Sequence, residues 1–109
     1  MISTKNNKKI LELADAILAL KTRNEAKRFL RDLLTEKELI EFGNRWKAAR
    51  MLADGIIYTE IEKETKLSST TVARVSKWLN TGKGGYKLML QKLNHHHNLS
   101  FEKRLAVFE

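Results

Sequence analysis

Residues 58–79 read YTEIEKETKLSSTTVARVSKWL, and this stretch predicts two short helices with a tight turn between them. The first helix is expected at about Tyr58 to Thr65. The second follows Ser68, whose hydroxyl suits an N-cap, and runs to about Asn80. Apolar residues stand where the two helices and their turn would pack together: Ile61, Leu67, Val72, Val75 and Leu79. This spacing, over about residues 58–80, is typical of a helix-turn-helix, which places its second helix in the major groove of DNA.

The other face of the predicted second helix carries short and basic side chains. Short side chains let a helix approach base edges, and basic ones bind phosphates or guanines. The expected base-edge contacts are Ser69, Thr70 and Ala73, and the expected phosphate contacts are Arg74, Lys77, Lys83 and Lys87. Glu62 and Lys66 depart from the usual pattern, in which a small residue follows the first anchor and a glycine opens the turn. A plain helical hairpin therefore stays open as the alternative.

Helical patterns continue on both sides of this unit, so we predict an all-α fold. Apolar residues at helical spacing predict helices at about 8–20, 23–33, 36–54, 86–93 and 99–108. Thr22 with Glu25, and Thr35 with Glu38, match the capping box, in which a hydroxyl and a carboxylate bind free amides at a helix start. Gly55 is the expected left-handed stop after the helix at 36–54. The wide apolar stripe of that helix favours a place at the centre of the fold or at a subunit contact.

The chain has 109 residues, a length typical of one domain, and contains no proline or cysteine. The lack of cysteine excludes disulfides, thiolate zinc sites and cysteine nucleophiles. No apolar run reaches the roughly 20 residues that span a bilayer, and no signal-peptide pattern is present, so we expect a cytoplasmic protein without a membrane partner. The formal net charge of +8 favours an anionic partner, and from Leu67 to Phe101 the sequence holds basic residues and no acidic one.

Three consecutive stretches resemble one known family: LTEKELIEFGNRWKAARMLADG at residues 34–55, the helix-turn-helix pattern, and LNTGKGGYKLML at residues 79–90. The family is the Trp repressor superfamily, and within it the TrpR-like YerC/YecD family. The resemblance covers about residues 34–93. It implies an intertwined, all-helical homodimer, dimerised through residues 8–33, that binds double-stranded operator DNA as a transcriptional repressor. Twofold symmetry would place two recognition helices about 34 Å apart, which is one turn of DNA.

The resemblance also raises the question of a tryptophan corepressor. Matched to the tryptophan-sensing members, the effector pocket would comprise Leu34, Thr35, Arg45, Thr71 and Arg74. Guanidinium groups stack on aromatic rings and pair with carboxylates, so the chemistry suits an amino acid. However, Val75 and Trp78 stand where those members have glycine and serine, and their side chains would fill space that a ligand needs. We therefore expect no cofactor; tryptophan and another small effector stay open as alternatives.

Other candidate sites have simpler interpretations. Three adjacent histidines, His95 to His97, suit a polar joint better than a metal site. Thr81–Gly85 lacks P-loop spacing and is expected to bring backbone amides, with Lys83 and Lys87, near the DNA backbone. Trp46 and Trp78 are expected in the core, and no catalytic set is visible, so we expect a regulator and not an enzyme. A protein-interaction module and a nucleic-acid binder without sequence preference remain the alternatives.

Overall fold

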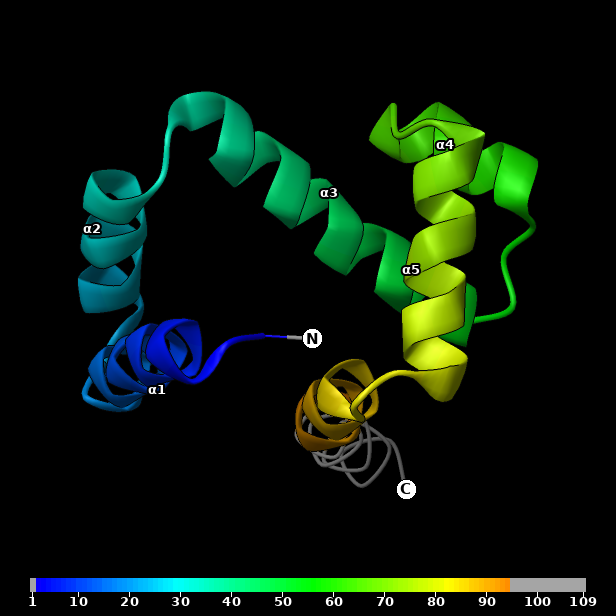
Figure 1. Ribbon diagram of the computed structural model, residues 1–109. Helices are drawn as coiled ribbons and strands as arrows, with labels where there is room; N and C mark the ends of the chain where they lie inside the picture. The colour runs from blue at the N-terminus through cyan, green and yellow to red at the C-terminus, as the bar shows by residue number, and fades with distance from the viewer. Residues whose placement is uncertain (1, 95–109) are drawn as a thin grey trace, which may run out of the picture. The chain divides into compact units, whose positions relative to one another are not determined.

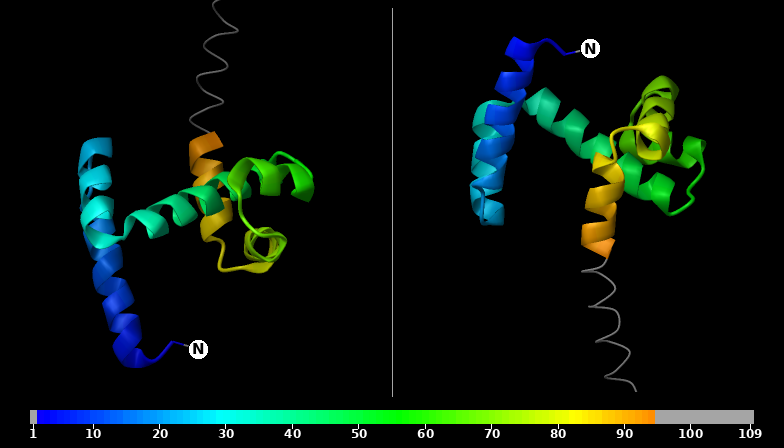
Figure 2. Two further views of the ribbon diagram at one scale, coloured as in Figure 1. Left: turned by 90° about the horizontal axis from the view of Figure 1, so that it is seen from above. Right: turned by 60° about the horizontal axis from the view of Figure 1, so that its bottom comes forward.

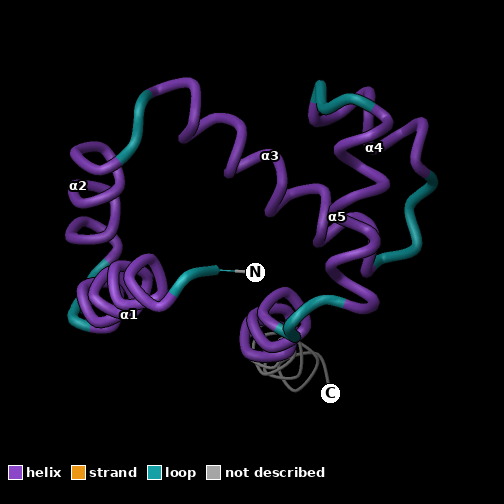
Figure 3. Tube along the Cα trace, viewed as in Figure 1, coloured by secondary structure: helices purple, strands orange, loops and turns teal. Residues whose placement is uncertain are grey.

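The structure is a computed structural model that describes residues 2–94, where α-helices are joined by short loops (Figures 1 and 3). The labelled helices are α1 (Thr4–Leu18), α2 (Arg23–Leu33), α3 (Glu36–Ala53), α4 (Tyr58–Thr65) and α5 (Ser69–Thr81). A further helical segment occupies residues 85–94. No strand occurs between residues 2 and 94, and the all-α prediction is confirmed. Two compact units meet within α3, between Ile40 and Glu41; that they form one domain stays a prediction.

The capping boxes predicted for α2 and α3 are present. Thr35 and Glu38 form the complete box: the Glu38 amide donates to the Thr35 hydroxyl at 3.1 Å, and the Thr35 amide donates to the Glu38 carboxylate at 3.0 Å. At α2 the Thr22 hydroxyl accepts from the Glu25 amide as expected. The Glu25 carboxylate, however, accepts from the amide of Lys21 and not from that of Thr22. The box at α2 is therefore displaced by one residue on its carboxylate side.

Helix α1 begins earlier than the sequence pattern predicts. It starts at Thr4 and not near residue 8, because the Ser3 hydroxyl accepts from the Asn6 amide at 3.2 Å and caps the helix. No residue of α1 or α2 is buried within this chain. Apolar side chains are instead exposed along both helices, and they include Ile10, Leu11, Leu13, Ile17, Leu18, Leu30 and Leu33. The N-terminal unit thus leaves its apolar surface uncovered.

The C-terminal unit, from Glu41 onward, contains the fully buried core. Ala48 and Ala49 of α3, Ile61 of α4, and Val72 and Val75 of α5 are all fully buried and form one cluster. Partly buried side chains pack against the cluster: Trp46, Met51, Leu52, Leu67 and Tyr86. The helix at 85–94, yellow to orange in Figure 2, lies beside α3. The apolar anchors predicted for the two short helices are therefore confirmed as core residues.

The turn between α4 and α5 accommodates a lysine where the sequence pattern would prefer glycine. Lys66 adopts the left-handed conformation with φ 62°, and its amide donates to the Glu62 carbonyl at 2.9 Å, which ends α4. The buried Thr65 hydroxyl donates to the Ile61 carbonyl and accepts from the Leu67 amide. These bonds hold the turn in place although it lacks glycine.

Helix α3 ends at the predicted glycine. Gly55 has φ 78°, its amide donates to the Leu52 carbonyl, and the Ile56 amide donates to the Met51 carbonyl. This pattern is the Schellman motif, which satisfies the last carbonyls of a helix. None of the helices between residues 2 and 94 has the length and apolarity needed to cross a membrane. The helix predicted at 99–108 and the histidines 95–97 lie outside the described residues.

Candidate nucleic-acid interface

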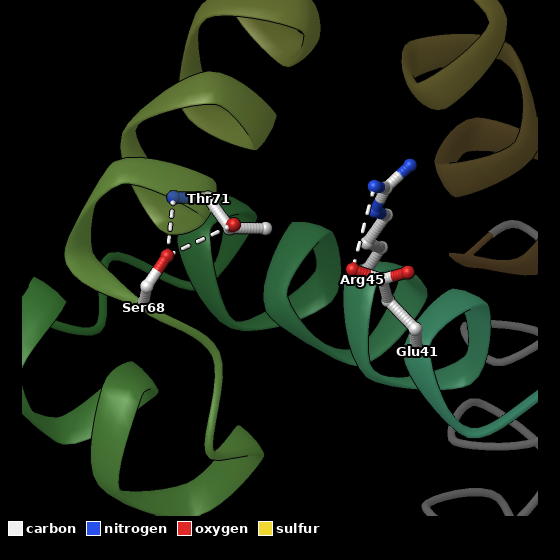
Figure 4. Close-up of polar contacts among 4 residues, drawn as sticks. All are labelled: Glu41, Arg45, Ser68 and Thr71. Atoms are coloured by element: carbon white, nitrogen blue, oxygen red, sulfur yellow. Dashed lines mark hydrogen bonds and ion pairs between the residues drawn. The ribbon is translucent and has the colours of Figure 1, made fainter. Parts of the chain in front are cut away.

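The first turn of α5 is fixed by a pair of hydroxyl side chains (Figure 4). Ser68 caps the helix: its Oγ accepts from the Thr71 amide at 3.1 Å and donates to Thr71 Oγ1 at 3.0 Å. Serine is among the best N-cap residues because its oxygen binds an amide that the helix itself cannot pair. Ser69 and Thr70 stand directly after this cap, and both are exposed. The cap therefore holds two short polar side chains in a defined position on the surface.

The two faces of α5 differ sharply in character. Val72, Val75 and Leu79 are buried against the core. The residues predicted to contact DNA from this helix are all exposed: Ser69, Thr70, Ala73, Arg74 and Lys77. A helix can enter a major groove when one of its sides packs against the core and the other carries short and basic side chains. The structure thus brings the five predicted contact residues of α5 onto its exposed side.

The loop after α5 contributes two more lysines, and its glycines have local structural reasons. Lys83 and Lys87 are exposed, and Lys87 Nζ donates to the Asn80 carbonyl near the end of α5 at 3.3 Å. A side chain at Gly82 would collide with the Trp78 carbonyl oxygen, to which the Gly82 amide donates. Gly84 has φ 85°, a conformation that favours glycine. The glycine-rich stretch is therefore first a tight connection between α5 and the helix at 85–94.

The charge of this region is not neutralised within the described chain. The two ion pairs between residues 2 and 94 are Glu41–Arg45 and Lys47–Glu64, and both lie before α5. Residues 67–94 hold five basic side chains and no acidic one. The positive charge of α5 and of the loop after it is therefore available to an anionic partner.

The residues matched to an effector pocket are divided between the two compact units, and the pocket stays a prediction. Leu34 and Thr35 belong to the N-terminal unit, at the end of α2 and the start of α3. In the C-terminal unit, the Arg45 guanidinium lies 3.6 Å from the Glu41 carboxylate (Figure 4). It also lies 5.4 Å from the Phe42 ring centre.

The other two candidates also have partners within the chain. Thr71 is bonded to Ser68, and the Arg74 guanidinium lies 6.0 Å from the Trp78 ring centre. Arg45 Nε, in contrast, is buried without a hydrogen-bond partner among the described residues.

One expectation about the tryptophans is wrong. Trp78 is 42% exposed and not part of the core. It stands at the edge of the buried stripe of α5, one residue before Leu79, where the described helices of the C-terminal unit leave it partly uncovered. Trp46 is half-buried and stacks on Tyr86. Burial raises the pKa of the Tyr86 phenol, and the positive charge of Arg45 opposes that shift. The phenol thus stays protonated at neutral pH.

Comparisons with known proteins point to one family. The family model described as Trp repressor protein matches residues 8–94. The uncharacterized protein YerC of Bacillus subtilis (strain 168) is 38% identical over 86 residues, which are 79% of this chain and 83% of that protein. A TrpR-like protein from Eubacterium eligens ATCC 27750 superposes with a TM-score of 0.75 at 33% identity, over 80% of this chain and 90% of that chain. A candidate Trp repressor from Staphylococcus aureus gives 0.77 at 32% identity, over 86% and 96%.

Proposed function

Because the chain belongs to the Trp repressor protein family, a family of DNA-binding regulators, we propose that it represses transcription as a homodimer bound to an inverted-repeat operator. The observation that carries this proposal is the exposed face of α5, with short side chains at its first turn and basic ones beyond. In this role the chain is a regulator and not an enzyme. We also propose a cytoplasmic location, because the similar proteins come from bacteria and bacterial DNA lies in the cytoplasm.

We assign separate roles to the exposed side chains. Ser69, Thr70 and Ala73 contact base edges, because they are short and stand at the start of α5, the part of a recognition helix that meets the bases. The exposed basic side chains contact phosphates: Arg74, Lys77, Lys83 and Lys87. Phosphate contacts fix the position of the protein on the duplex, and base contacts choose the sequence.

The homodimer is proposed from the uncovered apolar surface of the N-terminal unit. No side chain of α1 or α2 is buried within the chain, although apolar residues recur along both helices. Exposed apolar side chains that recur along two helices favour an interaction site in a protein that stays dispersed in water. A second copy would cover it with the same surface, as twofold symmetry requires. Sedimentation velocity of the protein should therefore show a dimer.

Selection of bound duplexes from a random DNA pool tests the function directly. We expect convergence on an inverted repeat with half-sites about one helical turn apart. Thr70→Ala should change the preferred sequence at one position of each half-site, by the about 1–3 kcal/mol that one base pair contributes. Binding without convergence would favour a nucleic-acid binder without sequence preference, and no binding would favour a protein-interaction module.

The phosphate contacts have their own test. Lys83→Ala should weaken binding to all sequences equally and reduce the slope of log K against log salt by about one unit, because one phosphate contact is lost. Lys37→Ala is the matched control, since Lys37 is also exposed but is not one of the assigned phosphate contacts. Equal effects of the two substitutions on the slope would contradict the assignment of Lys83.

We propose that this activity needs no corepressor at the matched pocket residues. Arg45, Thr71 and Arg74 are each held by a neighbour within the chain, and Trp78 stands beside Arg74. Added tryptophan should therefore leave the affinity for the selected operator unchanged. A tenfold or greater gain with tryptophan would show that these residues rearrange to bind it.

A further inference from the structure

Trp78 is a large aromatic residue of α5 that neither the core nor the proposed DNA contacts explain. Its side chain is 42% exposed, so it contributes little to the buried cluster of the C-terminal unit. One charged neighbour lies close to it: the Arg74 guanidinium is 6.0 Å from the centre of the Trp78 ring. Because Arg74 is one of the proposed phosphate contacts, the pair joins this unexplained ring to the DNA-binding side of α5.

Helix geometry brings the two side chains together. Arg74 and Trp78 are four residues apart on α5, and side chains at this spacing are neighbours on a helix surface. Helical side chains also lean toward the N-terminus, so the indole extends over the turn from which Arg74 projects. The Trp78 backbone is held at the end of α5, because its carbonyl accepts from the Gly82 amide at 2.9 Å. The indole therefore offers Arg74 a surface with a fixed origin.

Trp78 has a second set of neighbours that does not include Arg74. It lines a groove of about 700 Å³ in the C-terminal unit, together with Trp46, Tyr86 and Met89. Two roles are therefore open to Trp78: it serves as packing in the wall of this groove, or it acts on Arg74. The two roles predict different results for substitutions, because only the second requires an aromatic ring and an arginine at the same time.

Arg74 has no carboxylate to hold it within the described chain. The ion pairs between residues 2 and 94 join Glu41 to Arg45 and Lys47 to Glu64. Of the proposed phosphate contacts, Arg74 is the one whose cation lies over an aromatic ring in this part of the chain. An exposed arginine samples many rotamers, and fixing one of them on a phosphate costs conformational entropy. A ring that already restricts the side chain removes part of that cost.

The chemistry of an arginine permits both contacts at once. A guanidinium is planar: its face is attracted to the negative face of an aromatic ring, whereas its N–H donors lie in the plane and point outward. An arginine that rests on a ring therefore keeps its donors available for phosphate oxygens. The Trp78 ring and a phosphate thus do not compete for Arg74.

We propose that Trp78 is a positioning residue for DNA binding, whose indole holds the Arg74 guanidinium in an orientation that binds a phosphate. Trp78 itself does not contact DNA in this role. The inference rests on the proposed function, because it explains how one of the proposed phosphate contacts is prepared. Exposed cation–π pairs are weak, and their strength predicts an effect of about two- to fivefold on the dissociation constant for DNA.

The contact is tested first in the free protein. Trp78→Leu keeps an apolar side chain but removes the ring, whereas Trp78→Phe keeps a ring. An aromatic ring shifts the NMR signals of protons that lie over its face. The Arg74 Cδ–H signals in a ¹H–¹³C spectrum should therefore move in Trp78→Leu and move less in Trp78→Phe. Backbone amide signals show that each variant is folded, and Arg74 signals that do not respond to Trp78→Leu would overturn the proposal.

The effect on DNA is measured by fluorescence anisotropy, with a labelled duplex that the unsubstituted protein binds and at several salt concentrations. Trp78→Leu should raise the dissociation constant about two- to fivefold at each of them. The slope of log K against log salt should stay unchanged, because Arg74 still reaches its phosphate. Trp78→Phe should restore most of the affinity, and Trp78→Leu should cause no further loss in an Arg74→Ala background.

Met89→Ala is the matched control for the packing role. Met89 lines the same groove and is 44% exposed, close to the value for Trp78, so its loss should leave the affinity for DNA unchanged. A loss as large as that of Trp78→Leu would assign Trp78 to the groove wall and overturn the proposal. Equal effects of Trp78→Leu with and without Arg74 would overturn it as well.

The failure of this inference differs from the failure of the proposed function. If the unsubstituted protein binds DNA and Trp78 shows no coupling to Arg74, the role of Trp78 is refuted and the proposed function stands. If the unsubstituted protein binds no duplex, the proposed function is refuted, and the role of Trp78 in DNA binding is refuted with it.

Discussion

Replacing Lys66 by glycine should stabilise the protein. Lys66 is the non-glycine residue with positive φ between residues 2 and 94, at φ 62° and ψ 13°. The left-handed conformation costs an L-residue about 1–2 kcal/mol. Glycine adopts it without strain but loses about 0.5–1 kcal/mol more conformational entropy on folding. The difference predicts that Lys66→Gly raises the free energy of unfolding by about 0.5–1 kcal/mol.

Urea unfolding followed by circular dichroism measures this difference, at one protein concentration because dimerisation would couple to unfolding. Lys66→Ala is the control: it removes the lysine side chain but keeps the strained backbone. Since Lys66 is exposed, the alanine variant should stay within about 0.5 kcal/mol of the unsubstituted protein. If Lys66→Gly proves no more stable than Lys66→Ala, the turn does not hold the strain that we infer from its backbone angles.

The remaining predictions concern the core, a cap and the glycine loop. Ile61→Ala should lower the free energy of unfolding by about 2–5 kcal/mol in the same urea assay, because Ile61 is fully buried. The hydrogen bonds from Thr35 hold the pKa of Glu38 below its ordinary value of 4.5, so its stabilising contribution is present above that pH and is lost as the pH falls through the lowered pKa. Thermal unfolding from neutral pH downward should accordingly show a smaller acid-induced loss for Glu38→Gln; an equal loss would assign the acid sensitivity elsewhere. Gly82→Ala should lower the free energy of unfolding by about 1–3 kcal/mol, because a Cβ there collides with the Trp78 carbonyl. It should also shift the Trp78 indole N–H signal in a ¹H–¹⁵N NMR spectrum, and an unchanged signal would contradict the tight loop.

Local sequence signals predicted the helices well. The bounds of α2 and α4 agree with the expected ranges, and a capping threonine marks the start of α2. The start of α1 was predicted too late, since residues 4–7 are polar and only the Ser3 cap marks the true beginning. The conformation of Lys66 carries no local signal, because glycine is the residue that would announce it.

The sequence likewise predicted some features of the candidate sites and did not predict others. Which residues of α5 are exposed follows from helical periodicity, and the structure has them as predicted. The sequence did not predict the groove lined by Trp46, Trp78, Tyr86 and Met89, because no single-helix pattern brings residues from positions 46 to 89 together. The exposure of Trp78 was missed for a related reason: periodicity places it beside the buried stripe but does not tell whether another element covers it. The only available signal was the number of large aromatic residues flanking the glycine-rich loop.

The clean division between the two faces of α5 makes specificity and folding separable for protein engineering. The cap at Ser68 and the buried Val72, Val75 and Leu79 hold the helix, whereas Ser69, Thr70 and Ala73 are exposed. A combinatorial library that randomises those three surface positions should therefore consist mostly of folded proteins, because exposed substitutions usually change stability by no more than about 0.5 kcal/mol. The first turn of α5 then serves as an exchangeable cassette, in which new binding preferences can be selected on an unchanged scaffold.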